Sequence, residues 1–374
     1  MRFIGARTRT AIAGLAALAL AACAGTVPSP RTAQGPGDRP WSPSPLPQGA
    51  TSRPVVQPLP DAGANRPPPG LEPAIHELWR TFPGRTGIAI RRVDGNWSVA
   101  RRGDEYFPQQ SVSKLWVTLA LLDRVDRGEI ALNDRIAITA DDLTLFNQPL
   151  ATRVRREGRV EETAATLIDL AITGSDNTAN DSLLRHAGGP ESVRRFIDRH
   201  NLGRIRFGPG ERLLQSRIAG IEWQQRYSAG NSFQVARENV PLEVRRAALQ
   251  RYLADPEDGA SPEAIANALA RLARGELLSA TSTRTILDTM ARTRSGPQRL
   301  KAGVPAGWQV AHKTGTGQVL GALATGYNDI AILTAPDGTR YAVAVMMADT
   351  TASIPQRMQL MQGVSRAVAQ HHGT

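Results

Sequence analysis

Residues 308–317 read WQVAHKTGTG, and this stretch predicts a strand near the end of the chain. Its glycines would weaken a β-ladder, unless something has to approach the backbone closely there. NDIAILTA (328–335) and RYAVAVMMA (340–348) predict two more strands joined by a DG turn, and TGIAIRRV (86–93) and WSVARRG (97–103) predict a hairpin near the start. Because an isolated hairpin is only marginally stable, these segments need one another. We predict one antiparallel five-stranded sheet, built from both termini.

The residues between these strands, from about 111 to 294, have helical spacing. The most apolar predicted helix is SKLWVTLALLDRVDRG (113–128). In the segment that begins SPEAIANAL, Ser261 is placed to cap a helix and Pro262 occupies its first turn. A last helix is predicted from about residue 354 to 370. The fold class is therefore α/β (α+β), an antiparallel sheet flanked by helices with an inserted all-helical domain.

The start of the chain predicts a signal peptide over residues 1–22. A basic region is followed by the apolar run AIAGLAALALAA, which is too short to span a bilayer. The run ends in LAAC, which resembles the end of a bacterial lipoprotein signal, so that Cys23 would become the lipidated first residue. An ordinary secretory signal, with Cys23 incidental, is the alternative. Cys23 is the only cysteine, which excludes a disulfide within the chain.

Residues 23–70 hold 13 of the 26 prolines and predict a disordered tether. The globular domain is expected at 71–374, with an α/β part at about 71–110 and 295–374 and a helical part at about 111–294. We expect an exported, periplasmic monomer that contacts a membrane only through its lipid. That membrane is expected to be the outer membrane of a Gram-negative bacterium.

The formal net charge of +11 does not indicate a nucleic-acid partner. Seven of the 45 basic residues, but only two of the 34 acidic ones, lie before residue 71. The other charges are interspersed rather than run together, which favours a solvated surface. The six histidines form no HxH or HExxH pattern, so the sequence predicts no metal site and no cofactor.

Only three of the basic residues are lysines, and two of these lysines, Lys114 and Lys313, lie in short motifs. Arg stays protonated in proteins, whereas a desolvated Lys can lose its proton. In SVSK, Ser111 and Lys114 are spaced i and i+3 and so share one face of a helix. One interpretation is that Ser111 or Ser113 caps the helix while Lys114 is solvated. The other is a serine nucleophile whose proton Lys114 accepts, beside helix-terminal amides that hold an oxyanion.

The triplet SDN, residues 175–177, follows between two predicted helices, where by itself it would be interpreted as a cap. The order and spacing of SVSK, SDN and KTG, however, resemble a class A serine β-lactamase. The resemblance covers most of residues 71–374 and includes GNWSVARRGDEYFPQQSVSK (95–114) and GELLSATSTRTILDTM (275–290). It implies the β-lactamase/transpeptidase-like fold and a β-lactam as the small-molecule substrate.

The resemblance also implies the role of each motif. Ser111 would attack the lactam carbonyl and form an acyl-enzyme, losing its proton to Lys114 or through a water to Glu211. The amides of Ser111 and Thr316 would form the oxyanion hole. Ser175 would relay a proton to the leaving nitrogen. The remaining residues would bind substrate: Lys313 with Thr314, Gly315 and Thr316 at the carboxylate, and Asn177 at the acyl side-chain amide.

GERLLQ (210–215) lies where the family carries its omega loop. Glu211 matches the glutamate that positions the deacylating water, although alone it would be interpreted as a solvated loop carboxylate. Gln215 replaces the family's asparagine and is one methylene longer, so the water would be held less well. Residues 216–260 then exceed the family pattern by about thirty residues. We call residues 216–260 the extra segment; it is aromatic-rich, should be ordered and contains a predicted helix, PLEVRRAALQRYLA.

Two alternatives to a β-lactamase remain at this stage. A penicillin-binding D-alanyl-D-alanine peptidase would act on a peptidoglycan stem peptide and would release β-lactams slowly after acylation. A non-catalytic envelope lipoprotein would keep the fold for binding. Glu211 is the feature that separates hydrolase from peptidase, and the joint presence of Ser111, Lys114, Ser175 and Lys313 argues against the non-catalytic alternative.

Overall fold

The computed structural model describes residues 65–373 and contains the predicted five-stranded sheet, with every strand pairing antiparallel. β1 pairs with β11, so that Arg85 lies opposite Ala348 and Arg92 lies opposite Tyr341. The sheet is therefore closed by the two ends of the domain, and the predicted fold class is confirmed. Its strands, in spatial order, are β2 (Ser98–Arg101), β1 (Arg85–Arg92), β11 (Arg340–Ala348), β10 (Tyr327–Thr334) and β7 (Gln309–Thr316).

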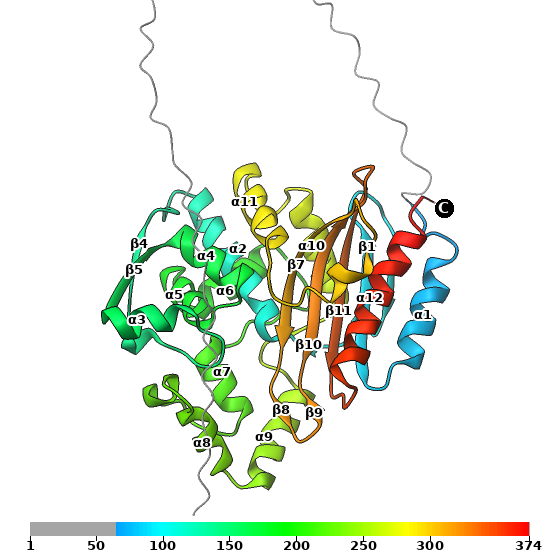
Figure 1. Ribbon diagram of the computed structural model, residues 1–374. Coiled ribbons are helices and arrows are strands. Elements are labelled where there is room, and N and C mark those ends of the chain that lie inside the picture. Colours follow the sequence, from blue (N-terminus) through cyan, green and yellow to red (C-terminus); the bar gives the residue numbers. More distant parts are fainter. Residues whose placement is uncertain (1–64, 374) are drawn as a thin grey trace, which may run out of the picture. The chain divides into compact units, whose positions relative to one another are not determined.

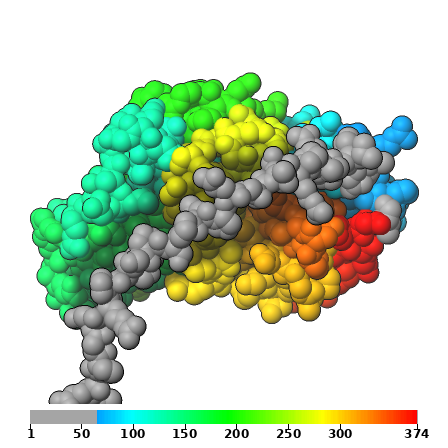
Figure 2. All heavy atoms as spheres, turned by 90° about the horizontal axis from the view of Figure 1, so that it is seen from above, coloured from blue at the N-terminus to red at the C-terminus, as the bar shows by residue number. Residues whose placement is uncertain are grey.

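Helices cover both faces of this sheet (Figure 1). Successive side chains of a strand point to opposite faces, and in β11 both sets are buried. Val343 and Val345 pack in the cluster beneath α1 (Leu71–Thr81) and α12 (Ile354–Gln370). Ala342 and Ala344 pack on the other face, which α10 (Pro262–Ala273) covers. The space-filling view shows the blue and red ends of the domain together at one side and the green helical part at the other (Figure 2).

The helix cap predicted from sequence at Ser261 is present. Ser261 accepts a hydrogen bond from the Ala264 N–H, and Pro262 follows it in the first turn of α10. The last helix, α12, begins with a capping box between Ser353 and Gln356. These caps satisfy backbone donors that a helix start would otherwise leave without partners.

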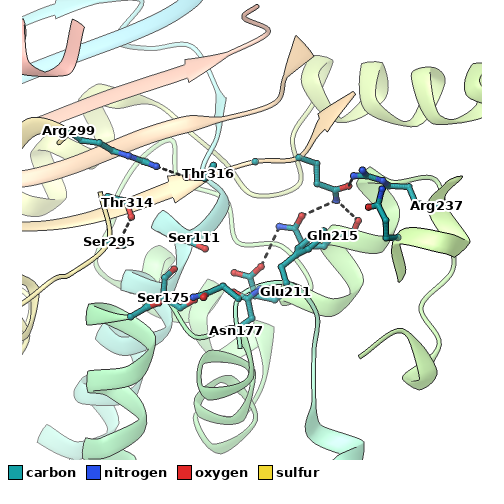
Figure 3. A pocket seen from close by; sticks show the side chains of 16 residues that line it. Ser111, Ser175, Asn177, Glu211, Gln215, Arg237, Ser295, Arg299, Thr314 and Thr316 are labelled. Atoms are coloured by element: carbon teal, nitrogen blue, oxygen red, sulfur yellow. Dashed lines mark hydrogen bonds between the residues drawn. The ribbon is translucent and has the colours of Figure 1, made fainter. Parts of the chain in front are cut away.

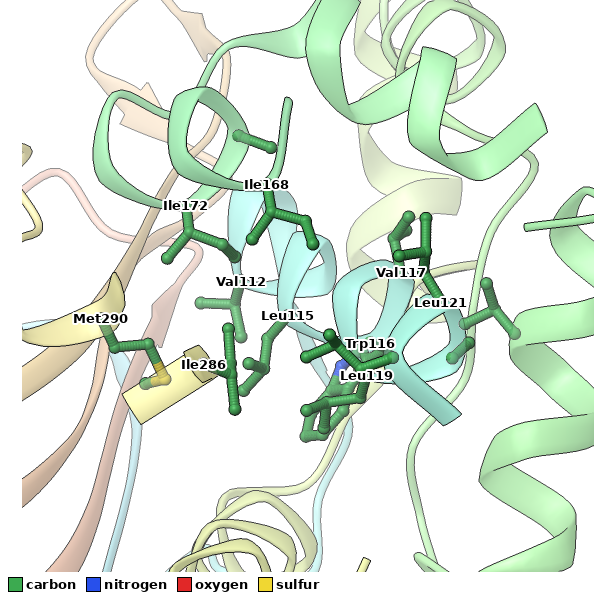
Figure 4. Packing of buried hydrophobic residues seen from close by; sticks show 14 of the residues in the cluster. Val112, Leu115, Trp116, Val117, Leu119, Leu121, Ile168, Ile172, Ile286 and Met290 are labelled. Carbon is green, nitrogen blue, oxygen red and sulfur yellow. The ribbon is translucent and has the colours of Figure 1, made fainter. Parts of the chain in front are cut away.

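The helix that follows Ser111, α2 (Lys114–Asp126), lies at the centre of the helical part (Figure 4). Its first nine residues are all buried, as expected of a helix that is surrounded by others. Leu115, Trp116 and Leu119 pack in the largest core cluster. Surrounding it are α4 (Ala164–Thr173), α5 (Asn177–His186), α6 (Pro190–Arg199) and α11 (Ala280–Ala291), with the 3₁₀ turn η2 (Gln110–Ser113) directly before it.

The prediction that the inserted domain is all-helical was wrong in part, because it also contains short strands. β4 (Arg135–Thr139) pairs with β5 (Arg159–Thr163), and Ile136, Ile138 and Val160 turn one face of this ribbon into the core. Five-residue strands inside a mainly helical region give too little alternation to be recognised. The other short elements are β3 (Phe107–Pro108) with β6 (Gly259–Ala260), β8 (Val319–Leu320) with β9 (Leu323–Ala324), α3 (Leu150–Glu157), η3 (Ala140–Asp142) and η5 (Leu300–Gly303).

The extra segment is folded onto the helical part through its aromatic residues. Tyr227 and Phe233 pack with Leu145 of the loop before α3, and Tyr252 packs against α7 (Glu211–Ile218). The predicted helix in PLEVRRAALQRYLA is present as α9 (Leu242–Ala254). Three further elements precede it, α7 (Glu211–Ile218), η4 (Gln225–Ser228) and α8 (Ser232–Glu238).

The predicted signal peptide, nearly all of the tether and Cys23 lie outside the described residues. Within residues 65–373, none of the helices combines the length and the apolar character needed to cross a membrane.

Candidate active site

Ser111 and Lys114 are held together at the start of the buried helix α2. Lys114 is fully buried, and its Nζ donates a hydrogen bond of 2.6 Å to Ser111 Oγ. The interpretation of Lys114 as a solvated side chain is therefore wrong. Ser113 caps nothing, since its hydroxyl donates to the Gln110 carbonyl at 2.8 Å. The i and i+3 spacing thus places an ammonium group directly against the serine oxygen.

Gln110, the residue before Ser111, has a left-handed backbone with φ +54°. This conformation is uncommon for a residue other than glycine and needs support from its surroundings. Two residues of the extra segment supply it. The Gln110 N–H donates to Asp258 Oδ2 at 2.7 Å, and Gln110 Nε2 donates to the Tyr252 hydroxyl at 2.6 Å. Tyr252 in turn donates to Asp258 Oδ1 at 2.8 Å, which closes a three-residue ring of hydrogen bonds.

Glu211 begins α7 and points at Lys114. It follows Gly210, whose φ of +101° favours glycine, and its N–H donates to Asp181 Oδ1 at 3.0 Å. Its buried carboxylate forms an ion pair with Lys114 Nζ. The interpretation of Glu211 as a solvated loop carboxylate is therefore wrong. Lys114 thus contacts both the Ser111 oxygen and a carboxylate, so that a proton can pass between them.

Gln215, one turn along α7, connects Glu211 to its surroundings. Its Nε2 donates to Gln110 Oε1 at 2.9 Å and approaches Glu211 Oε2 at 3.4 Å. Its Oε1 accepts a hydrogen bond of 3.0 Å from Gln318 Nε2. The side-chain amide of Gln215 is therefore fixed on both sides.

Ser175, from the loop before α5, and Lys313, from β7, form the second serine–lysine pair. Lys313 Nζ donates to Ser175 Oγ at 3.1 Å and to the Thr314 carbonyl at 3.0 Å. Burial lowers the pKa of the Lys313 ammonium well below its usual range, and the charge of Lys114 lowers this pKa further. Ser175 has φ +57°, which projects it from the loop before α5.

The rest of the SDN triplet has structural contacts. Asp176 caps α5 by accepting from the Ala179 N–H at 2.9 Å, and it accepts from the Leu150 N–H at 2.7 Å. The interpretation of the triplet as a cap is therefore correct for this residue. Asn177 Nδ2 donates to the Leu145 carbonyl at 2.8 Å, and its side chain lines the pocket.

The KTG glycine is explained by a close approach of two backbones. A Cβ at Gly315 would lie 2.3 Å from the Gln109 carbonyl oxygen, two residues before Ser111. Only glycine lets β7 pass this close to the turn that carries Ser111. On either side of it, the Thr314 hydroxyl lies 2.7 Å from Ser295 Oγ, and Thr316 Oγ1 accepts from Arg299 Nη2 at 2.6 Å.

These groups surround one pocket of about 450 Å³ (Figure 3). Seven predicted residues line it: Ser111, Ser175, Asn177, Glu211, Gln215, Thr314 and Thr316. Lys114 and Lys313 are fully buried, and they reach the pocket through their hydrogen bonds to Ser111 and Ser175. Gly315, also predicted to bind substrate, does not line the pocket and instead packs against the Gln109 backbone. Cys23 is not among the described residues.

Sequence reasoning missed several pocket residues. The extra segment adds two of them, Gln234 and Arg237. Arg299 donates to the Gly315 carbonyl at 3.0 Å, yet one arginine among so many carries no signal in the sequence. The other residues missed are Phe146, Asn147, Gly174, Ser295, Gly317 and Gln318.

A serine hydroxyl against a buried lysine, itself paired with a buried glutamate, defines the site of a serine hydrolase. Among residues 65–373, no His, Cys, Asp and Glu side chains cluster in a way that suits a metal ion. A model of the β-lactamase enzyme family matches residues 70–372, and the chain therefore belongs to this family, as a class A serine β-lactamase.

Individual relatives agree with this assignment. The β-lactamase VEB-1 of Pseudomonas aeruginosa is 25% identical over 279 residues, covering 74% of this chain and 81% of that relative. Two solved structures are also similar. A β-lactamase from Chitinophaga pinensis has a TM-score of 0.66 and 25% identity, covering 80% of this chain and 98% of its own. An ancestral class A β-lactamase has a TM-score of 0.62 and 29% identity, covering 80% and 99%.

Proposed function

We propose that this enzyme hydrolyses the amide bond of β-lactams through an acyl-enzyme on Ser111, which a water held by Glu211 then deacylates. The observation that carries the proposal is the position of Lys114. Its Nζ contacts both Ser111 Oγ and the Glu211 carboxylate. This contact lets the pair serve both half-reactions. Once Lys114 has passed a proton to Glu211, its neutral amine takes the serine proton, and the Glu211 carboxylate, restored when it returns that proton, later activates water.

In the acylation step, Ser111 Oγ attacks the lactam carbonyl carbon and its proton moves to Lys114 or, through a water, to Glu211. The backbone N–H groups of Ser111 and Thr316 would stabilise the oxyanion, a contribution of roughly 3 kcal/mol per donor. The C–N bond of the lactam then breaks. Ser175, held by Lys313, would relay to the leaving nitrogen the proton that Ser111 lost.

Substrate binding uses the walls of the same pocket. Lys313 and the hydroxyls of Thr314 and Thr316 would hold the ring carboxylate, and Arg299 adds a second cation beside Thr316. Asn177 would hold the acyl side-chain amide. In the deacylation step, Glu211 takes a proton from water, whose oxygen attacks the acyl carbon. The bond from the acyl carbon to Ser111 Oγ then breaks, and the proton returns to Ser111 Oγ through Lys114.

Replacing Ser111 by Ala should abolish both nitrocefin hydrolysis and covalent labelling by benzylpenicillin, because no other nucleophile lies at this position. Intact-protein mass spectrometry after mixing checks the labelling, and steady-state absorbance checks the turnover. Ser282→Ala, a buried serine on α11 away from the pocket, is the control and should keep both. Labelling that persists in Ser111→Ala would refute the assignment.

We also propose that the chain is exported to the periplasm and anchored there by lipid on Cys23, as a monomer. The basic and apolar regions of the first 22 residues, the LAAC sequence and the single cysteine support this proposal.

A further inference from the structure

The extra segment places a guanidinium group in the wall of the pocket. Arg237, near the end of α8, lines the pocket together with Gln234. Its Nη1 donates to Gln318 Oε1 at 3.1 Å. Gln318 also donates to the Gln215 carbonyl at 2.7 Å, so the residue that holds Arg237 is itself fixed. The guanidinium therefore has a defined position.

Arg237 has no ion-pair partner among residues 65–373, although the charge of the adjacent Glu238 raises its pKa slightly against the lowering effects of burial and Arg245. Among residues 65–373, neither Arg237 nor Arg245 forms an ion pair with a carboxylate, whereas Arg217 of the same segment pairs with Glu257. The nearby Glu238 instead accepts from Gln234 at 2.6 Å.

Arg245 places a second cation directly behind the first. Its Nη1 donates to the Arg237 carbonyl at 3.1 Å, and the buried Nε atoms of both arginines have no hydrogen-bond partner among the described residues. Burial lowers the pKa of Arg237, and the charge of Arg245 lowers this pKa further. An arginine nevertheless stays protonated, so the pair presents positive charge without an ion-pair partner in the described part of the chain.

The pocket thus has a cation at each end, with Ser111 between them. In the close-up, Arg299 and Thr314 lie on one side of Ser111 and Arg237 lies on the other (Figure 3). Glu211 is the one carboxylate among the described residues that line the pocket, and Lys114 pairs with it. A substrate that carries a single carboxylate leaves one of these ends unmatched.

We infer that Arg237 forms a subsite for an anionic group on the acyl side chain, so that the preferred substrates are β-lactams with two negative charges. This inference rests on the proposed function, in which the ring carboxylate takes the Lys313 end. A planar guanidinium binds a carboxylate or sulfonate through two parallel N–H donors. The extra segment is then part of the substrate-binding surface, and Arg237 determines specificity rather than chemistry.

The test compares benzylpenicillin with carbenicillin, which has the same skeleton and one additional side-chain carboxylate. For Arg237→Gln, the ratio of kcat/KM for carbenicillin to that for benzylpenicillin should fall about tenfold or more, the value of a charge-assisted hydrogen bond. Arg237→Lys, which keeps the charge, should give an intermediate ratio, and Arg237→Glu the lowest one. Arg246→Gln is the matched control, because Arg246 is exposed on α9 outside the pocket, and its ratio should equal that of wild type.

A second measurement needs no variant. Raising the salt concentration from 0.05 to 1 M should lower the same ratio in the wild-type enzyme, since salt screens the additional charge–charge attraction. An equal fall in kcat/KM for both penicillins in Arg237→Gln would overturn the inference. It would mean that Arg237 acts on the reaction through Gln318 and Gln215. If wild type hydrolyses neither penicillin, the proposed function fails first.

Discussion

At the scale of single residues, two lysines occupy buried positions at which an arginine could neither fit nor exchange a proton. Lys114 fills a fully buried space between Ser111 Oγ and Glu211, and its compact ammonium can exchange a proton with either. A guanidinium would stay protonated and would need room for five donors in a plane. Lys313 is buried in the same way against Ser175. The chemistry of these two positions therefore explains why they differ from the arginine-rich remainder of the chain.

Replacing Glu211 by Gln should stop the reaction at the acyl-enzyme, because a neutral amide cannot take a proton from water. Deacylation should slow by about 10² to 10⁴-fold, while Ser111 still becomes acylated. Mass spectrometry of the acid-quenched enzyme would show benzylpenicillin bound covalently. The control is Glu222→Gln, an exposed carboxylate of the extra segment, which should turn over as wild type does.

The contrary result would also be informative. If wild type already retains the covalent penicillin and Glu211→Gln retains it equally, Glu211 takes no part in deacylation. The enzyme would then be a penicillin-binding peptidase.

Most of the site was predictable at this scale, and the reason is the order of its motifs. Ser111, Lys114, Ser175 and Lys313 belong to short patterns whose spacing is specific only when taken together. Arg299, Arg237 and Gln318 belong to no such pattern. Their side chains reach the pocket through tertiary packing, which leaves no local trace in a sequence.

At the scale of elements, the extra segment supports the turn that carries Ser111. Asp258 and Tyr252 hold Gln110 in its left-handed conformation, and Gln110 is bonded to Gln215. Burial raises the pKa of Asp258 to about 6, against the lowering effect of the hydrogen bonds from Tyr252 and Gln110. The segment therefore contributes a buried titratable group next to the active site.

Stability should depend on the protonation of Asp258. Folding raises the pKa of this carboxyl from an ordinary value near 4, which means that the folded state favours its protonated form. The full stabilising contribution of Asp258 is therefore present below about pH 4. That contribution is lost as the pH rises through 6 and amounts to about 3 kcal/mol. Asp258→Asn should remove this pH dependence.

Urea unfolding of wild type and Asp258→Asn at pH 4 to 8 would check this prediction. The free energy of unfolding of wild type relative to the variant should decrease across the window. Asp255→Asn, three residues away and exposed, is the control and should follow wild type. Parallel pH curves for wild type and Asp258→Asn would contradict the prediction.

The main sheet and the long helices were predictable because their apolar residues recur with the clear spacing of a strand or a helix. β4 and β5 were not, since five alternating residues lie between segments of helical spacing. The path of the extra segment also lay beyond prediction. Its aromatic residues indicated order, but nothing local indicated that Tyr252 would reach Gln110.

At the scale of the whole molecule, the proposed anchor is separate from the proposed chemistry. Cys23→Ser should release the protein into the soluble periplasmic fraction, because the lipid would be its only contact with a membrane. The purified variant should keep the wild-type kcat/KM for nitrocefin, since no residue of the pocket lies near Cys23 in the sequence. Fractionation of cells with immunodetection measures the release. Continued recovery with membranes would place the anchor elsewhere.

The pairing of β1 with β11 sets a limit on when this molecule can fold. Arg85 meets Ala348, so the ribosome must synthesise nearly the entire chain before the central pairing of the sheet exists. Contacts between such distant segments form slowly, because the loop between them has to close first. Until then one edge of β1 lacks its partner strand, and α10, which packs on β1 and β11, lacks the finished sheet beneath it. A nascent chain built in this way cannot complete its sheet during most of its synthesis, and a chain without its finished sheet can still be threaded through a secretion channel.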